Sequence, residues 1–424
     1  MALSYLLDPV QILKGNNQSL VQDAVLIKDG VIQAFGEKAR SQGNQLGITP
    51  KSAPNQLLAP CLVDPHSVLE EPIHSQCETL KSLRIKAANA GYVQLALLPR
   101  SPSFRDRADR LTGFNNSNSD VLIHLWGSIS KNGKGVELSP YAEMLQHGAI
   151  GLAEDDAMLP ISLLKHVLTL NDKSQHPILL APRDVDIQED GIVREGIEAL
   201  RGGWLPDPLA SETLPLSQLI ELHRQYPKIS LRLMNISTAD GVSMLAESKT
   251  KPISSVCWWH LIKDSSSLHN NELGWRVVPS LGRPKDRRAL IQGLANKTIT
   301  AIAVHAIPLD EEETKLPTDK RLPGISSYSL VLPLLWQELV VNSKWSIEQL
   351  WDALSFGPST MLCLPKEELT IGSRRWLLFD PNKKWKQTLN PRKKPFCANQ
   401  PLQESEILGG IVDCGIKSEG VQND

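Results

Sequence analysis

Four ionisable side chains lie close together in the stretch from Leu57 to Pro72, LLAPCLVDPHSVLEEP. Asp64 and His66 come directly after an apolar run, and Glu70 and Glu71 follow a few residues later. Carboxylates and imidazoles are the side chains that bind zinc, and barrel enzymes carry such groups at the ends of their strands. The stretch therefore predicts a buried strand that runs into a loop able to bind a metal.

Eight apolar segments between residues 57 and 365 have the length of strands, and most are followed by a helical pattern. Parallel strands need crossover connections and are buried on both faces, so this alternation predicts a closed (β/α)8 barrel of the TIM type. An open, doubly wound sheet is the alternative, although the chain lacks the G-x-G-x-x-G turn typical of dinucleotide folds. The predicted strands are 57–64, 92–98, 121–126, 149–153, 177–181, 229–236, 253–258 and 300–306.

The two ends of the chain differ in character from this middle part. Residues 1–56 contain short alternating segments, a hairpin signal at Lys28-Asp29-Gly30 and a polar stretch, 41–55, typical of a surface loop. Residues 366–424 again carry short strands and are too few for a core of their own. We expect both ends, 1–56 and 366–424, to form one composite β-sandwich domain beside the barrel of 57–365.

Composition excludes several classes of partner. The chain has 424 residues with 45 basic and 47 acidic side chains, so its charge gives no reason to expect nucleic acid or an anionic membrane as a partner. Its apolar runs are far shorter than the roughly 20 residues of a membrane helix, and its start lacks the basic flank of a signal peptide. Its six cysteines are scattered, which favours reduced thiols. We expect a cytoplasmic protein.

The order of motifs resembles that of dihydroorotases in the amidohydrolase superfamily over nearly the whole chain. The segments that carry the resemblance are APCLVDPH (59–66), ETLKSLRIKAANAGY (78–92), GAIGLAEDD (148–156), NISTADGV (235–242), CWWHL (257–261), AVHAIP (303–308), LPGISSYSLVLPLL (322–335), FGPSTMLCL (356–364), LTIGS (369–373) and LFDPNKKW (378–385). The resemblance implies the barrel and the composite β domain. It also implies a site for one or two zinc ions that activate water against a cyclic amide.

The family's D-x-H-x-H-x-R motif falls on residues 64–70 of this chain. Its first His is kept as His66, the second is Val68, and the Arg that would hold the substrate carboxylate is Glu70. Valine cannot bind zinc, and a glutamate repels a carboxylate. This segment keeps one metal ligand and loses the substrate's cationic partner.

The remaining motifs have lost most of the implied site as well. The Asn of Met-Pro-Asn-Thr is Arg100, and the acidic ligand after strand four is kept as Asp155. The implied His ligands after strands five and six are replaced, and so are the general base and the last, substrate-facing His after strand eight. The residues at these four positions are Ala181, Asn235, Val304 and Pro308.

Two ligands, His66 and Asp155, cannot make a catalytic zinc site. We therefore expect no catalytic residue, no metal and no cofactor in a noncatalytic protein of pyrimidine biosynthesis, a pseudoenzyme. The residues of its vestigial substrate pocket would be Glu70, Arg100, Asn235, Pro308 and Gly324. The resemblance implies aspartate carbamoyltransferase as a partner, because some family members act as inactive scaffolds for it, and self-assembly into a homo-oligomer is the other possibility.

The alternative is an active dihydroorotase or related cyclic-amide hydrolase with a rewired zinc site. His260 and His305 are the residues that could join His66 and Asp155 in it, with Glu154 or Asp156 as a further ligand. Charged residues expected at the mouth of the barrel allow two interpretations. They form either a solvated rim or a pocket for an anionic ligand other than dihydroorotate. These residues are Glu70, Arg100, Arg183 and Arg283.

Overall fold

The computed structural model describes residues 4–114, 116, 119–155, 157–170, 176–268, 276–317, 320–388, 392 and 394–416. Its centre is a parallel sheet in the order β14-β13-β12-β9-β8-β7-β6-β5, and the backbone N–H of Val68 closes the ring by donating to the carbonyl of Ala306 at 2.8 Å. The predicted (β/α)8 barrel is thus confirmed, and the open sheet is not the fold. The strands are β5 (Leu62–Ser67), β6 (Tyr92–Leu97), β7 (Leu122–Ser128), β8 (Gly151–Ala153), β9 (Ile178–Leu180), β12 (Leu231–Leu233), β13 (Ile253–Cys257) and β14 (Ala301–Ala303).

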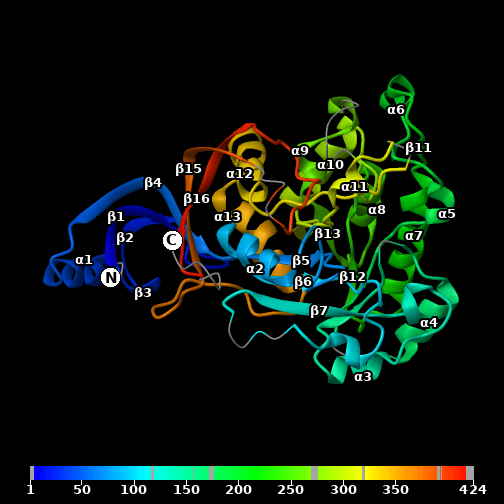
Figure 1. Cartoon of the computed structure of the whole chain (residues 1–424), viewed down its shortest axis with the longest axis horizontal. Helices are drawn as coiled ribbons and strands as arrows, with labels where there is room; N and C mark the ends of the chain where they lie inside the picture. Colours follow the sequence, from blue (N-terminus) through cyan, green and yellow to red (C-terminus); the bar gives the residue numbers. More distant parts are fainter. Residues whose placement is uncertain are drawn as a thin grey trace.

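Helices follow the strands and cover the barrel (Figure 1). Most of them bury apolar side chains against it. Helix α2 begins at a local signal, because Thr79 caps it by accepting from the backbone N–H of Ser82 at 3.2 Å. The α-helices of this part are α2 (Leu80–Asn89), α3 (Tyr141–Gln146), α4 (Ile161–Leu170), α7 (Ala210–Gln225), α8 (Ala239–Glu247), α9 (Trp259–Ile262), α10 (Pro284–Ala295), α11 (Glu311–Thr314), α12 (Val331–Leu335), α13 (Ile347–Trp351) and α14 (Gly357–Met361). Two π-helical segments, η4 (Trp336–Asn342) and η5 (Asp352–Phe356), and three short 3-10 turns, η1 (Ala108–Leu111), η2 (Lys131–Gly133) and η3 (Ser265–Ser267), complete the set.

Strands from both ends of the chain form one six-stranded sheet beside the barrel, in the order β16-β15-β4-β1-β2-β3 (Figure 1). The predicted hairpin is present, with Asp29 and Gly30 both at positive φ in the turn between β2 and β3. Helix α1 (Gly36–Gln45) packs against this sheet. The strands are β1 (Ser4–Ile12), β2 (Val21–Lys28), β3 (Val31–Phe35), β4 (Pro50–Pro60), β15 (Trp376–Lys386) and β16 (Glu406–Cys414).

Two local predictions in the N-terminal part are wrong. The stretch 41–55 is not one loop, because it contains the end of α1 and the first half of β4; Gly43 of α1 lies so close to Leu6 that a Cβ would be 2.8 Å from that side chain. The strand predicted over 57–64 is two strands that meet at Cys61. Its first residues pair with β1 and β15 in the terminal sheet, and only the part from Leu62 enters the barrel.

Between β9 and α7 the chain makes an excursion that we did not predict. It contains α5 (Val185–Gln188), β10 (Val193–Arg194), α6 (Ile197–Gly202) and β11 (Pro206–Asp207), and the two short strands pair in parallel. Figure 1 shows α6 at the edge of the molecule, at the end remote from the terminal sheet. The elements are too short for their sequence pattern to be recognised.

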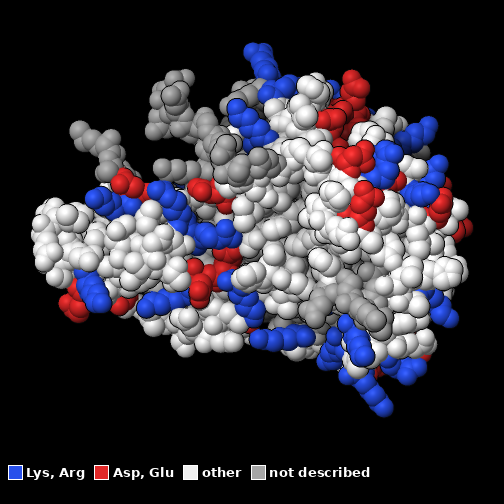
Figure 2. Space-filling view, turned by 90° about the horizontal axis from the view of Figure 1, so that it is seen from below, with Lys and Arg blue, Asp and Glu red and all other residues white. Residues whose placement is uncertain are grey.

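The surface agrees with the balanced charge of the sequence. On the face seen in Figure 2, basic and acidic side chains are interspersed, and much of the surface carries neither. Within the described ranges, none of the helices is long and apolar enough to cross a bilayer.

Candidate functional site

The carboxylate of Asp64 joins the first strand of the barrel to the last. It is fully buried, and it accepts from the backbone N–H of Val304 at 3.0 Å, from the hydroxyl of Tyr328 at 2.9 Å and from Ser67. Ser67 accepts in turn from the backbone N–H of Ala306 at 2.8 Å. Burial raises the pKa of Asp64 to about 6, although these hydrogen bonds lower it. Asp64 thus closes the barrel and is engaged on both of its oxygens.

His66, the first of the two retained ligand positions, is also engaged on both sides. Its Nδ1 lies 3.1 Å from Nδ1 of His305, and its Nε2 lies 2.8 Å from the hydroxyl of Ser255. The two imidazoles meet edge to face, with ring centroids 5.1 Å apart. The structure therefore brings His66 and His305 together as a hydrogen-bonded pair.

Apolar side chains fill the places where the resemblance implies metal ligands. Val68 and Ala181 are both buried in one cluster inside the barrel, which also contains the fully buried indole of Trp126. The indole N–H donates to the carbonyl of Pro65 at 3.1 Å, so this ring packs directly beside the D-x-H segment. Val304 is buried as well, in the main core. Burying these apolar side chains together removes them from water, which stabilises the barrel.

Asp155, the second retained ligand position, is held by Arg100 in an ion pair in which one N–H is shared between both carboxylate oxygens. The Nε of Arg100 lies 2.8 Å and 3.0 Å from the two carboxylate oxygens, so the residue at the implied substrate position neutralises the implied ligand. Glu154 points elsewhere, because it accepts from the hydroxyl and the backbone N–H of Ser130 at 3.0 and 3.1 Å. Burial raises the pKa of Glu154 to about 7. Asp156 lies outside the described residues.

Asn235 and His260 follow β12 and β13 and keep buried polar atoms without a hydrogen-bond partner among the described residues. Asn235 has a φ of 55° and donates its backbone N–H to Ser255 at 3.1 Å, but neither side-chain atom of its amide is bonded. His260 donates from Nε2 to the carbonyl of Pro279 at 3.0 Å, which leaves Nδ1 unprotonated and unbonded. Burial lowers the pKa of His260 to about 4, so the ring is neutral near pH 7.

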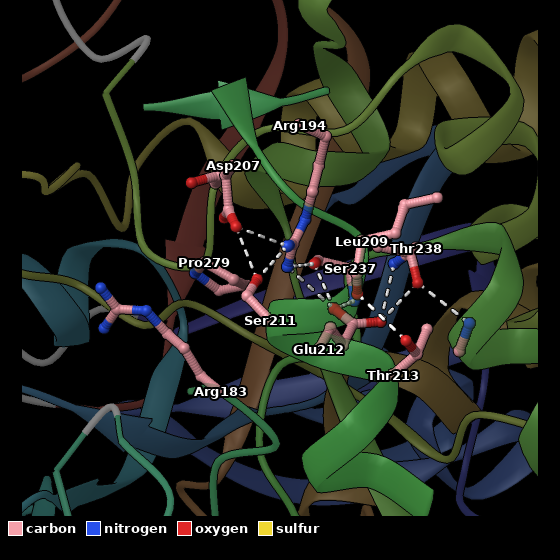
Figure 3. Close-up of polar contacts among 12 residues, drawn as sticks. Arg183, Arg194, Asp207, Leu209, Ser211, Glu212, Thr213, Ser237, Thr238 and Pro279 are labelled. Carbon is pink, nitrogen blue, oxygen red and sulfur yellow. Dashed lines mark hydrogen bonds and ion pairs between the residues drawn. The ribbon is translucent and has the colours of Figure 1, made fainter. Parts of the chain in front are cut away.

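A buried ion network, which sequence reasoning missed, fixes the loop that carries Asn235. Arg194 lies 3.1 Å from the carboxylate of Asp207 and 3.3 Å from that of Glu212, and all three side chains are buried (Figure 3). Glu212 also accepts from the backbone N–H groups of Ser237 and Thr238, at 3.0 and 3.1 Å. No signal in the sequence could have found the network, because each of its charged residues looks like a solvated surface charge when taken alone.

A cavity of about 510 Å³ opens at the carboxyl ends of the strands. Glu70, Arg100 and Pro308 line it, and so does Arg183, whose Nε donates to Gln188 at 2.6 Å. Acidic side chains outnumber basic ones along the lining, which disfavours an anionic ligand such as dihydroorotate.

Two residues placed in the predicted pocket do not belong to its lining. Asn235 is buried and does not line the cavity, and neither does Gly324. Gly324 instead makes a close approach of two segments, because a Cβ there would lie 2.8 Å from the carbonyl oxygen of Ile307. Arg283 is not at this mouth but caps α10, with its Nε 2.8 Å from Asp286.

The donor set does not fit the zinc site that the family resemblance implies. In the ranges that the structure describes, no three side chains of the types His, Cys, Asp and Glu lie together so that they could hold a metal ion. Zinc needs three or four such ligands. His66 and His305 form one pair, Asp155 is bound to Arg100, and His260 is bonded to Pro279, so the rewired set does not converge.

Relatives with known names align with most of the chain. A dihydroorotase-like protein of Synechocystis is 31% identical over 394 residues, which cover 84% of this chain and 88% of that protein. The dihydroorotase of Acetivibrio thermocellus is 25% identical over 91% of both chains, and that of Bacillus pumilus is 26% identical over 97% of this chain and 96% of its own. No family model matches the chain.

Solved structures with the same architecture are named as dihydropyrimidinases and hydantoinases. The dihydropyrimidinase of Brevibacillus agri superposes with a TM-score of 0.76 at 15% identity, covering 97% of this chain and 93% of that one. The L-hydantoinase of Arthrobacter aurescens gives a TM-score of 0.76 at 14% identity, covering 97% and 94%. At this identity the likeness establishes the shared fold, a barrel with a β domain built from both termini.

Proposed function

Since the chain belongs to the dihydroorotase-like family of the amidohydrolase superfamily, we propose that it keeps this fold without hydrolysing a cyclic amide. The ion pair between Arg100 and Asp155 carries the proposal. A carboxylate that is bound on both oxygens by a guanidinium is neutralised, and it would have to give up that partner before it could bind a metal.

The chemistry of the other positions supports the same proposal. Hydrolysis in this family would need a water whose pKa is lowered from about 16 to about 7 by a metal, and a general base to take its proton. Val304 stands at the base position, and Val68 and Ala181 stand at two ligand positions. A buried valine can neither accept a proton nor bind a metal.

The alternative is an active hydrolase of cyclic amides with a rewired site. The observation in its favour is the His66–His305 pair, with Nδ1 atoms 3.1 Å apart and a Ser255 hydroxyl beside it. If the chain turns over such a substrate, His66→Gln should abolish that turnover. An activity that H66Q leaves unchanged would place the chemistry elsewhere and sink this alternative too.

Metal analysis combined with a turnover assay tests the proposal. The purified chain is exposed to zinc, freed of excess ion, analysed for bound metal and assayed with dihydroorotate. We expect less than stoichiometric zinc and no turnover, for Arg100→Asn as well as for the unmodified chain, because the apolar ligand positions remain. Stoichiometric zinc with turnover in the unmodified chain would overturn the proposal. Zinc in R100N alone would mean that the ion pair blocks a usable site.

We further propose a role in assembly in the cytoplasm, with aspartate carbamoyltransferase as the partner. The family resemblance supports this partner, and the six cysteines, none of which forms a disulfide, suit a reducing compartment. Gel filtration of the chain mixed with the transcarbamoylase of the same cell tests it. Co-elution with raised transcarbamoylase activity supports the role, and separate elution at micromolar concentration contradicts it.

A further inference from the structure

A second cavity, of about 220 Å³, lies at the amino end of β14, at the opposite end of the barrel from the cavity at the carboxyl ends of the strands. Thr300, the residue before β14, lines it together with Lys297 and Ile299 of the loop after α10. Asn16 and Asn17, from the turn between β1 and β2, complete the lining. The cavity therefore lies at the junction of the barrel and the terminal sheet. Barrel enzymes carry their catalytic residues at the other face, so a ligand here would bind without reacting.

The π-helical segment η5 forms part of the cavity wall. Asp352, Ala353 and Phe356 of this segment line the cavity. π-Helical turns are rare and are found frequently at functional sites. The helix start that follows packs directly on the barrel, because a Cβ at Gly357 would lie 2.1 Å from the carbonyl oxygen of Thr300. The wall is thus preformed, and a preformed site loses little conformational entropy on binding.

Buried apolar side chains make up one part of the lining. They are Leu294, Ile299, Ala353 and Phe356, each at most 6% exposed. A dry cavity of about 150 Å³ holds a benzene ring, so this cavity has room for one six-membered ring with a small substituent. An apolar wall with a few polar groups is the usual composition of a small-molecule site.

Hydrogen-bond donors make up the other part. Lys366 lines the cavity and has no ion pair or hydrogen bond with any described residue. The side-chain oxygen of Gln349 accepts from the backbone N–H of Ser346 at 2.9 Å, which leaves the NH₂ group of Gln349 without a partner in the same part of the chain. The second lysine of the lining, Lys297, is neutralised by Asp352 at 2.9 Å. The free charge of the cavity is therefore that of one ammonium group.

From this arrangement we propose that the cavity binds a small organic anion, a single six-membered ring that carries one carboxylate. The ring lies against the apolar wall, and the carboxylate accepts from Lys366 and Gln349. An inorganic anion would leave the apolar wall uncovered, and a neutral ring would leave the ammonium group unpaired. The proposal does not depend on the proposed function, because the cavity is remote from the carboxyl ends of the strands. Since the lining comes from both the barrel and the terminal sheet, the bound anion should stabilise their junction.

Ligand-detected NMR titration of the full chain with benzoate measures the binding. We expect a Kd on the order of 1 mM, as suits a ligand of this size. Benzamide has the same shape without the charge and should bind about tenfold more weakly, and acetate, which keeps the charge without the ring, should bind more weakly than benzoate as well. Benzoate at ten times its Kd should raise the melting temperature by about 3 °C.

Two substitutions locate the site. Lys366→Met removes the ammonium group and keeps the length of the side chain, so it should weaken benzoate about tenfold and leave benzamide unchanged. Lys81→Met is the matched control, because Lys81 is exposed at the start of α2, beyond the carboxyl end of β5, and it should change neither affinity. Both lysines are exposed, so neither substitution should shift the melting temperature of the free chain appreciably.

Four results would overturn the proposal. They are no binding of benzoate, benzoate that binds no more tightly than benzamide, a K366M chain that binds benzoate as tightly as the unmodified chain, and an equal loss of affinity in K81M.

Discussion

Replacing Val68 by histidine restores the second His of the D-x-H-x-H motif, and we predict that it restores neither zinc binding nor hydrolysis. The side chain of Val68 is buried in the apolar cluster that also contains Ala181 and Trp126. That cluster offers no hydrogen-bond partner to an imidazole at this position. The substitution therefore adds a buried polar group and extra volume, and the other ligands are still absent.

The cost of Val68→His can be estimated from two effects. Overpacking of a dense core costs about 1 to 3 kcal/mol, and a buried polar group without a partner costs about 1 to 3 kcal/mol more. At roughly 2 °C per kcal/mol for a large domain, the melting temperature should fall by about 4 to 12 °C. Val68→Phe is the matched control, because it adds comparable volume without a polar group. It should show only the cost of overpacking.

Thermal unfolding with and without zinc is the assay. If zinc bound the folded variant, a concentration of 100 times Kd would add about 2.7 kcal/mol of stability. We expect no such shift in V68H or V68F at zinc concentrations up to the limit of solubility. A rise in the melting temperature confined to V68H, with one bound zinc per chain, would refute the reasoning that the site is lost at several positions at once.

The other predictions concern buried charges. Arg194→Met leaves two buried carboxylates without their cation and should lower the free energy of unfolding by about 3 to 5 kcal/mol. Arg224→Met is the control, because it removes an exposed ion pair and should lower that free energy by under about 1 kcal/mol. Equal melting temperatures for the two variants would contradict the stabilising role of the network. Glu154→Gln should remove a pH dependence. The pKa of Glu154 in the folded chain is raised to about 7. The unmodified chain should therefore gain stability relative to E154Q as the pH falls from 7 towards 4.5, by about 1.4 kcal/mol per pH unit. Denaturant unfolding at several pH values measures this difference. Tyr328→Phe removes a hydrogen bond to Asp64 and should cost about 1.5 to 3 kcal/mol at pH 7. The cost should be smaller at pH 5, where Asp64, with its pKa of about 6, is protonated; a cost independent of pH would mean that Asp64 stays ionised.

The barrel could be predicted from the sequence because its strands are buried on both faces and so form continuous apolar runs. Tyr92–Leu97 and Ile253–Cys257 are examples. The N-terminal boundary of the barrel could not be predicted, because the end of β4 and the start of β5 form one apolar run. Only the hydrogen bonds of each part decide which sheet it joins. Periodicity reports burial, and it does not report the partner strand.

The expectation that ligand positions are lost also came from the sequence, since it depends on residue types alone. The contacts that the residues at these positions make could not be predicted. Arg100 and Asp155 are 55 residues apart, and only the fold shows that they form an ion pair. The same holds for His66 and His305, separated by 239 residues. Contacts between distant side chains follow from the strand order, which a single sequence does not encode locally.

An active site keeps polar groups without internal partners, so that a ligand can satisfy them, and this arrangement costs stability. At the ends of β5, β6 and β8, the carboxylates named above have internal partners. Asp64 is bonded to Tyr328, and Arg100 to Asp155. At the ends of β12 and β13 that arrangement persists, because Asn235 and His260 keep buried polar atoms that no described residue satisfies. The polar groups at the strand ends are thus satisfied on one side of the barrel and unsatisfied on the other. Any ligand chemistry that this chain retains is to be sought beside Asn235 and His260, not at the D-x-H segment.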